Sequence, residues 1–320
     1  MRLRFWGTRG SLPVATRANA IRSKVARALV AAGGRSFADE QAALAFIDDG
    51  LDFATGNGFG GATSCVEIET EGGPFILCDM GSGLREFGID AIGRCARGQK
   101  REFHIFLSHL HWDHIMGFPF FGPAYDPRVT ITIYAGHEDA ETALRRQQEE
   151  ISFPVPFDRL GADIRFVTLK PGQPIQAAGL DVVAIRQFHS HDSYGFRFSD
   201  GTRSVVYSTD SEHHMDTMDA ETQFERFFGG ADVVICDTMY SLADTVTLKA
   251  DWGHSSNLVA VDLCHAAAAK TLVLFHHEPA ASDDDIQTMY RETIRYEELT
   301  RADATALDVV CAYDGLELDV

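Results

Sequence analysis

The chain has 320 residues, of which 45% are hydrophobic and 23% charged, as is ordinary for a globular protein. Its formal net charge is −19, and no cluster of Lys and Arg stands out that would replace the counterions of a long nucleic acid, so extended RNA or DNA is disfavoured as a partner. No apolar run approaches the roughly 18 residues of a membrane span, and the first residues lack the apolar region of a signal peptide. We therefore expect a soluble protein without a membrane partner.

The six cysteines indicate a reducing environment. They are scattered along the chain without a C-x-x-C pair, and several lie within apolar runs, as in Val234-Ile235-Cys236. A buried, reduced thiol is the expected state of such a residue. No disulfide framework is therefore expected, and this cysteine usage predicts a cytoplasmic location.

Apolar periodicity and turn residues predict alternating strands and helices along the chain. In chain order we expect a strand at 3–6, helices at 18–32 and 38–49, a hairpin of strands at 64–70 and 74–79, a helix at 83–96, strands at 103–107 and 129–134, a helix at 138–149, strands at 163–169, 180–187, 194–198 and 204–208, a helix at 218–228, a strand at 232–236, a helix at 255–269, a strand at 271–275, a helix at 283–299 and a last hairpin at 307–319. Strand-rich segments broken by helices predict two sheets sandwiched between helices, in one domain over 1–320.

The segment at about 14–60 is predicted to be a helical insertion beside the first strand. Asp39, before Glu40 and Gln41, is a suitable N-cap for its second helix. The glycine-rich residues 53–61 lack the Lys-Ser/Thr ending of a phosphate loop, so we assign them no nucleotide role. A lid over a cleft, a dimer surface and an inert elaboration are three alternatives for this insertion, and the sequence does not choose among them.

The densest set of metal-binding residue types directly follows a predicted strand. Three histidines and one aspartate occur within the run His109-Leu110-His111-Trp112-Asp113-His114. Neutral imidazole and carboxylate are the donors that borderline divalent metals such as zinc prefer. In a tight turn His109 and His111 can meet at one ion. Asp113 and His114 can then reach a second ion, so the run predicts a site for two divalent metals, with zinc favoured and manganese or iron as alternatives.

This run resembles the H-x-H-x-D-H signature of the metallo-β-lactamase superfamily, and the resemblance extends over nearly the whole chain outside 14–60. It implies an α/β fold, the αββα sandwich of two mixed sheets flanked by helices. It also implies that Asp79, which closes the second hairpin strand, hydrogen-bonds a metal-ligating histidine and fixes its tautomer. The alternative for Asp79 is a turn-forming residue before Gly81.

The same resemblance implies three ligands further along the chain. Family spacing favours His189 over His191 before a Gly-aromatic strand, and His276 over His277 at the end of another strand, and both alternatives stay open. Asp210 ends a strand where the family places a carboxylate that bridges the two ions. The implied ligand set is His109, His111 and His189 for one ion, Asp113, His114 and His276 for the other, and Asp210 between them.

The resemblance also implies the catalytic groups. Water between two such ions would have its pKa pulled from about 15.7 toward about 7, which makes a bridging hydroxide available as the nucleophile. Asp113 would also orient this nucleophile. His254 lies in a segment that resembles the His-Ser/Thr segment of the phosphodiesterase branch, especially the ribonuclease Z group, where the histidine assists the departing oxyanion. The alternative is a plain helix cap by Ser255 or Ser256.

The segments 5–11, 60–65 and 275–279 resemble a bacterial group related to ribonuclease Z and to small phosphodiesterases. Ribonuclease Z carries a protruding basic arm for tRNA, and no matching insertion occurs between Asp163 and His189. We therefore expect a hydrolase of a small phosphodiester, of the cyclic nucleotide or cyclic phosphate type, and a small anionic substrate as its partner. A homodimer is compatible with the sequence.

Other assignments for the same site remain open. Arg9, Arg197 or His191 could contact the phosphate of the substrate. Three aromatic residues after the metal motif could stack on a base or pack in the core, namely Phe118, Phe120 and Phe121. The alternative functions are hydrolysis of a carboxylic ester, lactone or thioester on the same metals, and a metal-bound sensor with little turnover.

Overall fold

The structure, a computed structural model, describes residues 1–213, 218–240, 253–302 and 304–320. Two seven-stranded sheets make up the centre of the molecule, ordered β14-β1-β2-β3-β4-β5-β6 and β13-β12-β11-β10-β9-β8-β7. The strands of the first sheet are β1 (Arg2–Gly7), β2 (Cys65–Glu69), β3 (Phe75–Cys78), β4 (Glu102–Leu107), β5 (Thr130–Ala135), β6 (Asp163–Thr168) and β14 (Glu317–Asp319). Those of the second sheet are β7 (Ile175–Ala177), β8 (Leu180–Gln187), β9 (Ser193–Ser199), β10 (Ser204–Ser208), β11 (Val233–Asp237), β12 (Thr271–Phe275) and β13 (Asp308–Cys311).

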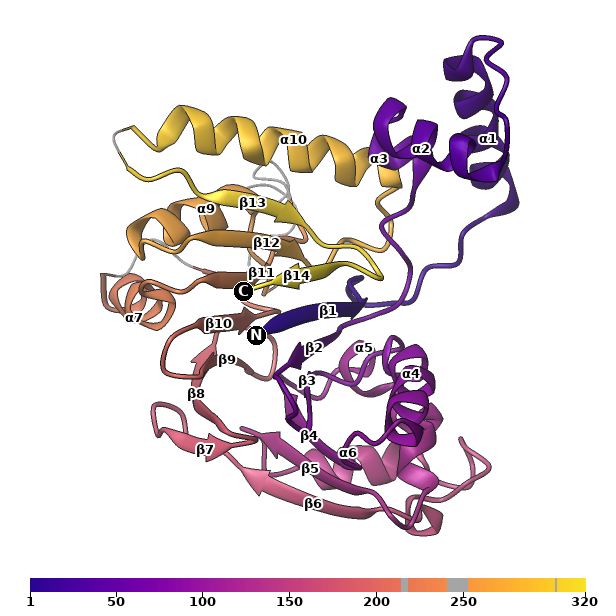
Figure 1. Ribbon diagram of the computed structural model, residues 1–320. Helices are drawn as coiled ribbons and strands as arrows, with labels where there is room; N and C mark the ends of the chain where they lie inside the picture. Colours follow the sequence, from indigo (N-terminus) through magenta and orange to yellow (C-terminus); the bar gives the residue numbers. More distant parts are fainter. Residues whose placement is uncertain (214–217, 241–252, 303) are drawn as a thin grey trace.

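Helices cover the outer faces of both sheets, which confirms the expected sandwich of two mixed sheets between helices (Figure 1). The helices are α1 (Ala18–Ala32), α2 (Glu40–Gly50), α3 (Phe53–Gly56), α4 (Leu84–Ala96), α5 (Trp112–Ile115), α6 (Ala140–Gln147), α7 (Met218–Phe228), α9 (Asn257–Ala266) and α10 (Asp283–Thr300). A core between the sheets includes Phe5, Phe106 and Phe275, while separate cores lie beneath the helices of each outer face. Strands buried on both faces explain the continuous apolar runs of the sequence, such as Phe75–Cys78.

The predicted hairpin at 307–319 is wrong. β13 pairs in parallel with β12 in the second sheet, whereas β14 pairs antiparallel with β1 in the first. The residues between them cross from one sheet to the other, with Ala312 N–H donating to Leu274 O and Gly315 N–H donating to Phe5 O. Two short strands around a turn have the same sequence pattern in a hairpin and in such a crossover, because only tertiary partners distinguish them.

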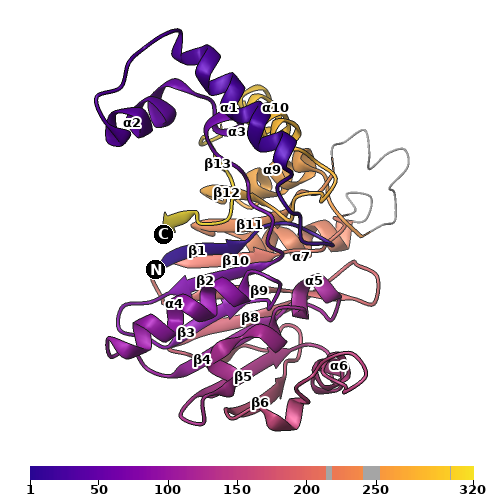
Figure 2. The ribbon, with the colours of Figure 1, turned by 90° about the vertical axis from the view of Figure 1, so that its right-hand side faces the viewer.

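The helical segment at 18–56 stands beside the end of α10 and projects beyond the sheets in both views (Figures 1 and 2). Asp39 accepts a hydrogen bond from Ala42 N–H, so the predicted N-cap is confirmed. The glycine-rich residues 53–61 begin with the short helix α3, which Asp52 caps. Whether this segment is an insertion into a single domain stays a prediction.

The strands bring the expected site residues to one edge of the sandwich. β3, β4 and β5 run in parallel, as do β10, β11 and β12, so within each group the carboxyl ends point the same way. The histidine run begins where β4 ends, while Asp210 follows β10 and His276 follows β12. Among the described residues, no helix is long and apolar enough to cross a membrane.

Candidate metal centre

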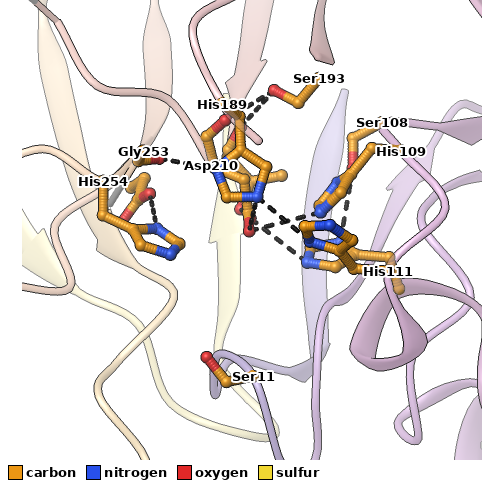
Figure 3. Close-up of polar contacts among 12 residues, drawn as sticks. Ser11, Ser108, His109, His111, His189, Ser193, Asp210, Gly253 and His254 are labelled. Atoms are coloured by element: carbon orange, nitrogen blue, oxygen red, sulfur yellow. Dashed lines mark hydrogen bonds and ion pairs between the residues drawn. The ribbon is translucent and has the colours of Figure 1, made fainter. Parts of the chain in front are cut away.

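The candidate centre lies where β3, β4, β10 and β12 end, and Figure 3 shows His109, His111 and His189 gathered around Asp210. Asp79, Asp210 and His276 each follow a strand directly or within two residues, and each has a positive φ, of 63°, 48° and 62°. This left-handed conformation is uncommon for residues other than glycine and occurs preferentially at functional sites. The backbone therefore turns sharply at these three strand ends and directs their side chains into a common space.

A first group of ligating atoms comes from His109, His111, His189 and Asp210, and these atoms all lie within 4.8 Å of one another. His189 Nε2 is 3.2 Å from His111 Nδ1. Asp210 Oδ2 is 3.6 Å from both His109 Nε2 and His189 Nε2. Three imidazole nitrogens and one carboxylate oxygen thus converge on one point, as the donors of a divalent metal do.

A second group of ligating atoms comes from Asp113, His114, His276 and again Asp210, within the same 4.8 Å limit. Asp210 Oδ1 is 3.2 Å from His114 Nε2 and 3.2 Å from His276 Nε2. Asp113 Oδ2 is 3.2 Å from His114 Nε2 and 3.3 Å from His276 Nε2. Asp210 therefore turns one carboxylate oxygen to each group, which is the geometry of a bridging ligand.

Buried hydrogen bonds fix the tautomers of the histidines from the first sheet. Asp79 accepts hydrogen bonds from His114 Nδ1 at 2.7 Å, from Tyr207 O–H at 2.7 Å and from Ser108 O–H at 2.8 Å. Because Ser108 Oγ has donated its proton to Asp79, it accepts from His109 Nδ1 at 3.0 Å. Nδ1 of each histidine is thus engaged in a hydrogen bond, so Nε2 is the nitrogen that faces Asp210. The predicted role of Asp79 as a partner of one of these histidines thus has the required contact.

Two glycines hold the histidines from the second sheet at close range. His189 Nδ1–H donates to Gly253 O at 2.8 Å, and a Cβ on Gly253 would lie 2.4 Å from His189 Nδ1. A Cβ on Gly10 would lie 2.6 Å from His276 Cε1. Any larger residue at 253 or 10 would therefore push a ring out of the site.

The donor set fits a cation. His109 Nε2 and His114 Nε2 are buried and have no hydrogen-bond partner among the described residues, and an unpaired buried polar atom is costly unless something binds it. Burial lowers the pKa of His109, and lowers that of His111 to about 4, so both rings are neutral at pH 7, as metal binding requires. Burial also acts to lower the pKa of His114, but the neighbouring carboxylates of Asp210 and Asp113 raise it well above its ordinary value. The proton on His114 offsets the negative charge of these two carboxylates, and a metal cation bound at the same place would do so as well.

His254 adds a further ionisable group beside both groups of ligands. Its Nδ1 lies 2.6 Å from Asp237 Oδ2, and its ring centre lies 5.1 Å from that of His189 and 5.3 Å from that of His276. Burial by itself lowers the pKa of His254, but the Asp237 carboxylate outweighs this effect and raises it to about 9. His254 is therefore protonated at neutral pH in the metal-free molecule.

The helix cap given as the alternative for the His254 segment is also present, on Ser256. Ser256 Oγ accepts from Val259 N–H at 3.3 Å and caps α9, while Ser255 O–H donates to Ser211 O at 2.6 Å. Both serines are thus occupied by backbone groups, which leaves His254 free to face the site. The first two residues of the segment, 251 and 252, lie outside the described residues.

The histidines left as alternatives lie outside both groups of ligating atoms. His277 is buried, and its Nε2–H donates to Ala312 O at 2.8 Å. Burial also lowers the pKa of His277 to about 4, so its ring is neutral at pH 7. His191 is exposed, with its ring centre 6.3 Å from that of His111. The geometry therefore supports His189 and His276 as the ligands.

Neither arginine suggested for phosphate binding is placed for it. Arg9 is buried and donates to the carbonyl oxygens of Gly60, Glu278 and Ala281. Arg197 donates to carbonyl oxygens at the end of α7 and does not line the cavity at the candidate centre. Both guanidinium groups serve as structural donors to loops, a role that isolated arginines in a sequence do not reveal.

Sequence reasoning missed two contributors to the site. Asp237 ends β11, between the strands that lead to Asp210 and His276, so its place at the same edge could have been derived from the order of the parallel strands. Ser11 donates its backbone N–H to Asp113 Oδ2 at 2.7 Å. Such a backbone contact cannot be predicted from a pattern of side chains. Together these residues line or support a cavity of about 480 Å³ at the centre, bordered also by His111 and His254.

Relatives of the chain are known. The family model described as "Beta-lactamase superfamily domain" matches residues 76–277, a span that contains every candidate ligand. The "Probable metallo-hydrolase YhfI" of Bacillus subtilis is 25% identical over 182 residues, which cover 54% of this chain and 64% of that protein. A ribonuclease Z of Methanosarcina acetivorans is 27% identical over 144 residues, 44% of this chain and 43% of that protein. The chain thus aligns with less than two thirds of the length of each of these two relatives.

A solved structure extends the likeness to the whole fold. The crystal structure of the metallo-β-lactamase fold protein YhfI from Bacillus subtilis covers 99% of this chain and 98% of its own, with a TM-score of 0.64 and 19% sequence identity. At this identity the match concerns the fold alone.

Proposed function

The chain belongs to the metallo-β-lactamase superfamily, and from this premise we propose that it is a binuclear metal-dependent hydrolase of small phosphodiesters, of the cyclic nucleotide or cyclic phosphate type. The observation that carries this proposal is the sharing of Asp210 between two groups of candidate ligating atoms. The phosphodiester class is supported by the relative named ribonuclease Z, because a ribonuclease cleaves phosphodiesters.

Two divalent ions would be held by the two groups. The ligands would be His109, His111 and His189 for one ion, Asp113, His114 and His276 for the other, and Asp210 for both. We propose zinc, with manganese or iron as alternatives that the same donors accept. When bound, such ions lower the pKa of water and neutralise charge on a phosphoryl oxygen, which makes hydrolysis feasible at neutral pH.

Asp113 is proposed to orient the attacking water. Its Oδ2 accepts the Ser11 N–H at 2.7 Å, and this contact restrains rotation of the carboxylate. Asp113 also lines the cavity at the centre, so a water hydrogen-bonded to it would be held beside the substrate.

His254 is proposed to protonate the departing oxygen. As the P–O bond of the substrate breaks, the leaving oxygen gains negative charge and needs a proton. The hydrogen bond from Nδ1 to Asp237 orients the His254 ring and leaves its Nε2–H for this oxygen. Asp237 would act as a positioning residue that also stabilises the protonated imidazole.

A small substrate is supported by size and charge. The cavity of about 480 Å³ is within the range of small-molecule sites. Between β6 and His189 the chain forms β7, β8 and their turns, without a protruding arm. The net charge of −19 further disfavours a long nucleic acid, although two cations would offset the charge locally where a small anion binds.

The test combines metal content with turnover. The protein is purified without chelator, its metals are counted by elemental analysis, and the same sample is assayed on bis-p-nitrophenyl phosphate. About two metals per chain are expected, with metal-dependent turnover that His111→Ala and His189→Ala abolish. His191→Ala is the matched control, because His191 neighbours the site but lies outside both groups.

Each other outcome has a definite meaning. Two metals without phosphodiester cleavage would refute the substrate class and favour the ester, lactone or thioester alternative. An absence of bound metal after reconstitution would refute the metal centre. Metal loss in His191→Ala together with retention in His189→Ala would reverse the ligand assignment.

We also propose a cytoplasmic location, supported by six cysteines that are all free in the structure. We also propose one domain over 1–320 with an insertion at about 14–60, supported by the pairing of β1, which precedes that segment, with β2, which follows it.

A further inference from the structure

A second cavity opens beside the metal centre, and its walls are mostly apolar. We name it the Trp112 groove and define it by Leu110, Trp112, Met116, Phe120, Arg146 and Phe153, which line a cavity of about 580 Å³. Leu110 and Trp112 line both this groove and the cavity at the metal centre. The groove therefore borders the metal centre directly, and a substrate with its phosphate at the metals would have this groove beside it.

The groove exposes aromatic surface that folding alone does not explain. Trp112 is 79% exposed, although it stands directly between the candidate ligands His111 and Asp113. Phe120 is 59% exposed and packs edge-to-face on Phe153, with ring centres 5.4 Å apart. Its neighbours Phe118 and Phe121 are fully buried, so only Phe120 of these three turns outward. Large apolar groups exposed together beside a catalytic site mark a place for ligand binding.

A cation stands at the rim of the groove. Arg146, on α6, is exposed and makes no ion pair within the part of the chain that the structure describes. Its neighbour Arg145, by contrast, pairs with Glu141 and Asp158. In a chain of net charge −19, an unpaired arginine beside this opening favours the approach of an anion.

From these observations we propose that the Trp112 groove binds a planar aromatic substituent of the substrate, such as a nucleobase or an aryl group, while the phosphate occupies the metal centre. Trp112 and Phe120 would supply the stacking surface, and Arg146 would attract the anionic substrate. The identity of the anion rests on the proposed function, and the groove adds the substrate class: phosphodiesters that carry an aromatic group.

The test uses two ligands that differ only in the aromatic group. Phenylphosphonate and methylphosphonate present the same anion, and isothermal titration calorimetry on the zinc-loaded protein gives both dissociation constants without turnover. We expect phenylphosphonate to bind about tenfold more tightly, the ratio that stacking of one ring provides. The ratio should fall close to one in Phe120→Ala and in Trp112→Ala, while Trp112→Phe should keep most of it.

Two controls separate stacking from indirect effects. Leu299→Ala removes an equally exposed apolar side chain from α10 and should leave the ratio unchanged. Because Trp112 lies between candidate ligands, the zinc content of each variant is measured by elemental analysis, and Phe120→Ala provides the same test outside that loop.

Several outcomes would overturn the proposal. They are a ratio near one in the unchanged protein, a ratio that neither substitution alters, and an absence of binding of both phosphonates. Light scattering gives the oligomeric state of the unchanged protein and of Trp112→Ala and Phe120→Ala. If these substitutions dissociate an oligomer but keep the ratio of the two dissociation constants, the groove contacts another copy of the chain instead of a ligand. The proposed function fails separately, through absent turnover of bis-p-nitrophenyl phosphate, because the binding ratio does not depend on catalysis.

Discussion

The metal centre and the helices α1 and α2 differ in how many of their side chains are buried and hydrogen-bonded within the chain. At the centre, Asp79 alone accepts hydrogen bonds from Ser108, His114 and Tyr207, and all four residues are buried. In α1 only Ala32 is buried, and in α2 no residue is. The centre is thus held in place by many buried contacts that depend on one another, whereas few contacts hold the helical segment.

The helical segment nevertheless has a defined attachment. Lys24 Nζ lies 2.6 Å from Asp283 and donates to Ala54 O at 2.6 Å, and Arg27 pairs with Asp284 at 2.8 Å. Its apolar side chains gain little from this arrangement, since Ile21, Val25 and Leu29 are 51%, 53% and 69% exposed on one side of α1. Substitutions in the two regions should therefore differ greatly in their effects.

The largest effect is expected for Asp210→Ala. This change removes the carboxylate that faces both groups of ligating atoms, so both ions should be lost and turnover should fall to background. Elemental analysis and a phosphodiesterase assay check this outcome. Retention of two metals by the variant would show that Asp210 does not bridge, and the interdependence claimed for the centre would be wrong.

His254→Ala should have the next largest effect. Loss of a general acid lowers kcat by about 10²- to 10⁴-fold for a substrate with a poor alkoxide leaving group. For p-nitrophenolate, which needs little protonation, the loss should be much smaller, and the metal content should not change. Equal losses for both leaving groups would instead assign His254 a structural role.

A smaller effect is expected for Asp79→Asn. An amide cannot accept the His114 and Ser108 protons with the strength of a carboxylate, so the affinity for metal should fall by about 10- to 100-fold. Competition with a chromogenic chelator measures this affinity. Asp90→Asn, on α4, is the control and should leave the affinity unchanged, because this half-buried carboxylate pairs with Arg94 and not with a candidate ligand.

The smallest effect should follow from Lys24→Ala. A single partly exposed ion pair contributes on the order of 1 kcal/mol or less, so the free energy of global unfolding should hardly change. Turnover should stay within about twofold of its original value, while proteases should cleave residues 18–50 faster, because local opening needs less free energy than global unfolding. A large loss of turnover would mean that the helical segment acts as a lid and would remove the contrast between the two regions.

The parts of the fold and site that the sequence predicts are those with local signals. The run from His109 to His114 places two candidate ligands of each group within six residues, and the strand that precedes it is mostly apolar. The alternation of strands and helices therefore followed from periodicity, with differences at the ends of elements and with the short elements α3, α5 and β7 not predicted.

The parts that the sequence does not predict depend on contacts between distant segments. The final strands were assigned to one hairpin because nothing local distinguishes it from a crossover between sheets. Asp237 is a single carboxylate at a strand end, and its place at the site can be predicted only from the position of β11 between β10 and β12. Arg9 and Arg197 bind backbone carbonyl oxygens, which have no sequence signature.

The buried cysteines have a consequence of a different kind. Burial raises the pKa of every thiol, so each remains unreactive while its surroundings are closed. The six are divided between the two halves of the sandwich, with Cys65, Cys78 and Cys95 in β2, β3 and α4, and Cys236, Cys264 and Cys311 in β11, α9 and β13. An alkylating reagent followed by peptide mass spectrometry would thus record the opening of each half separately. The chain carries its own set of conformational reporters, and no label needs to be engineered into it.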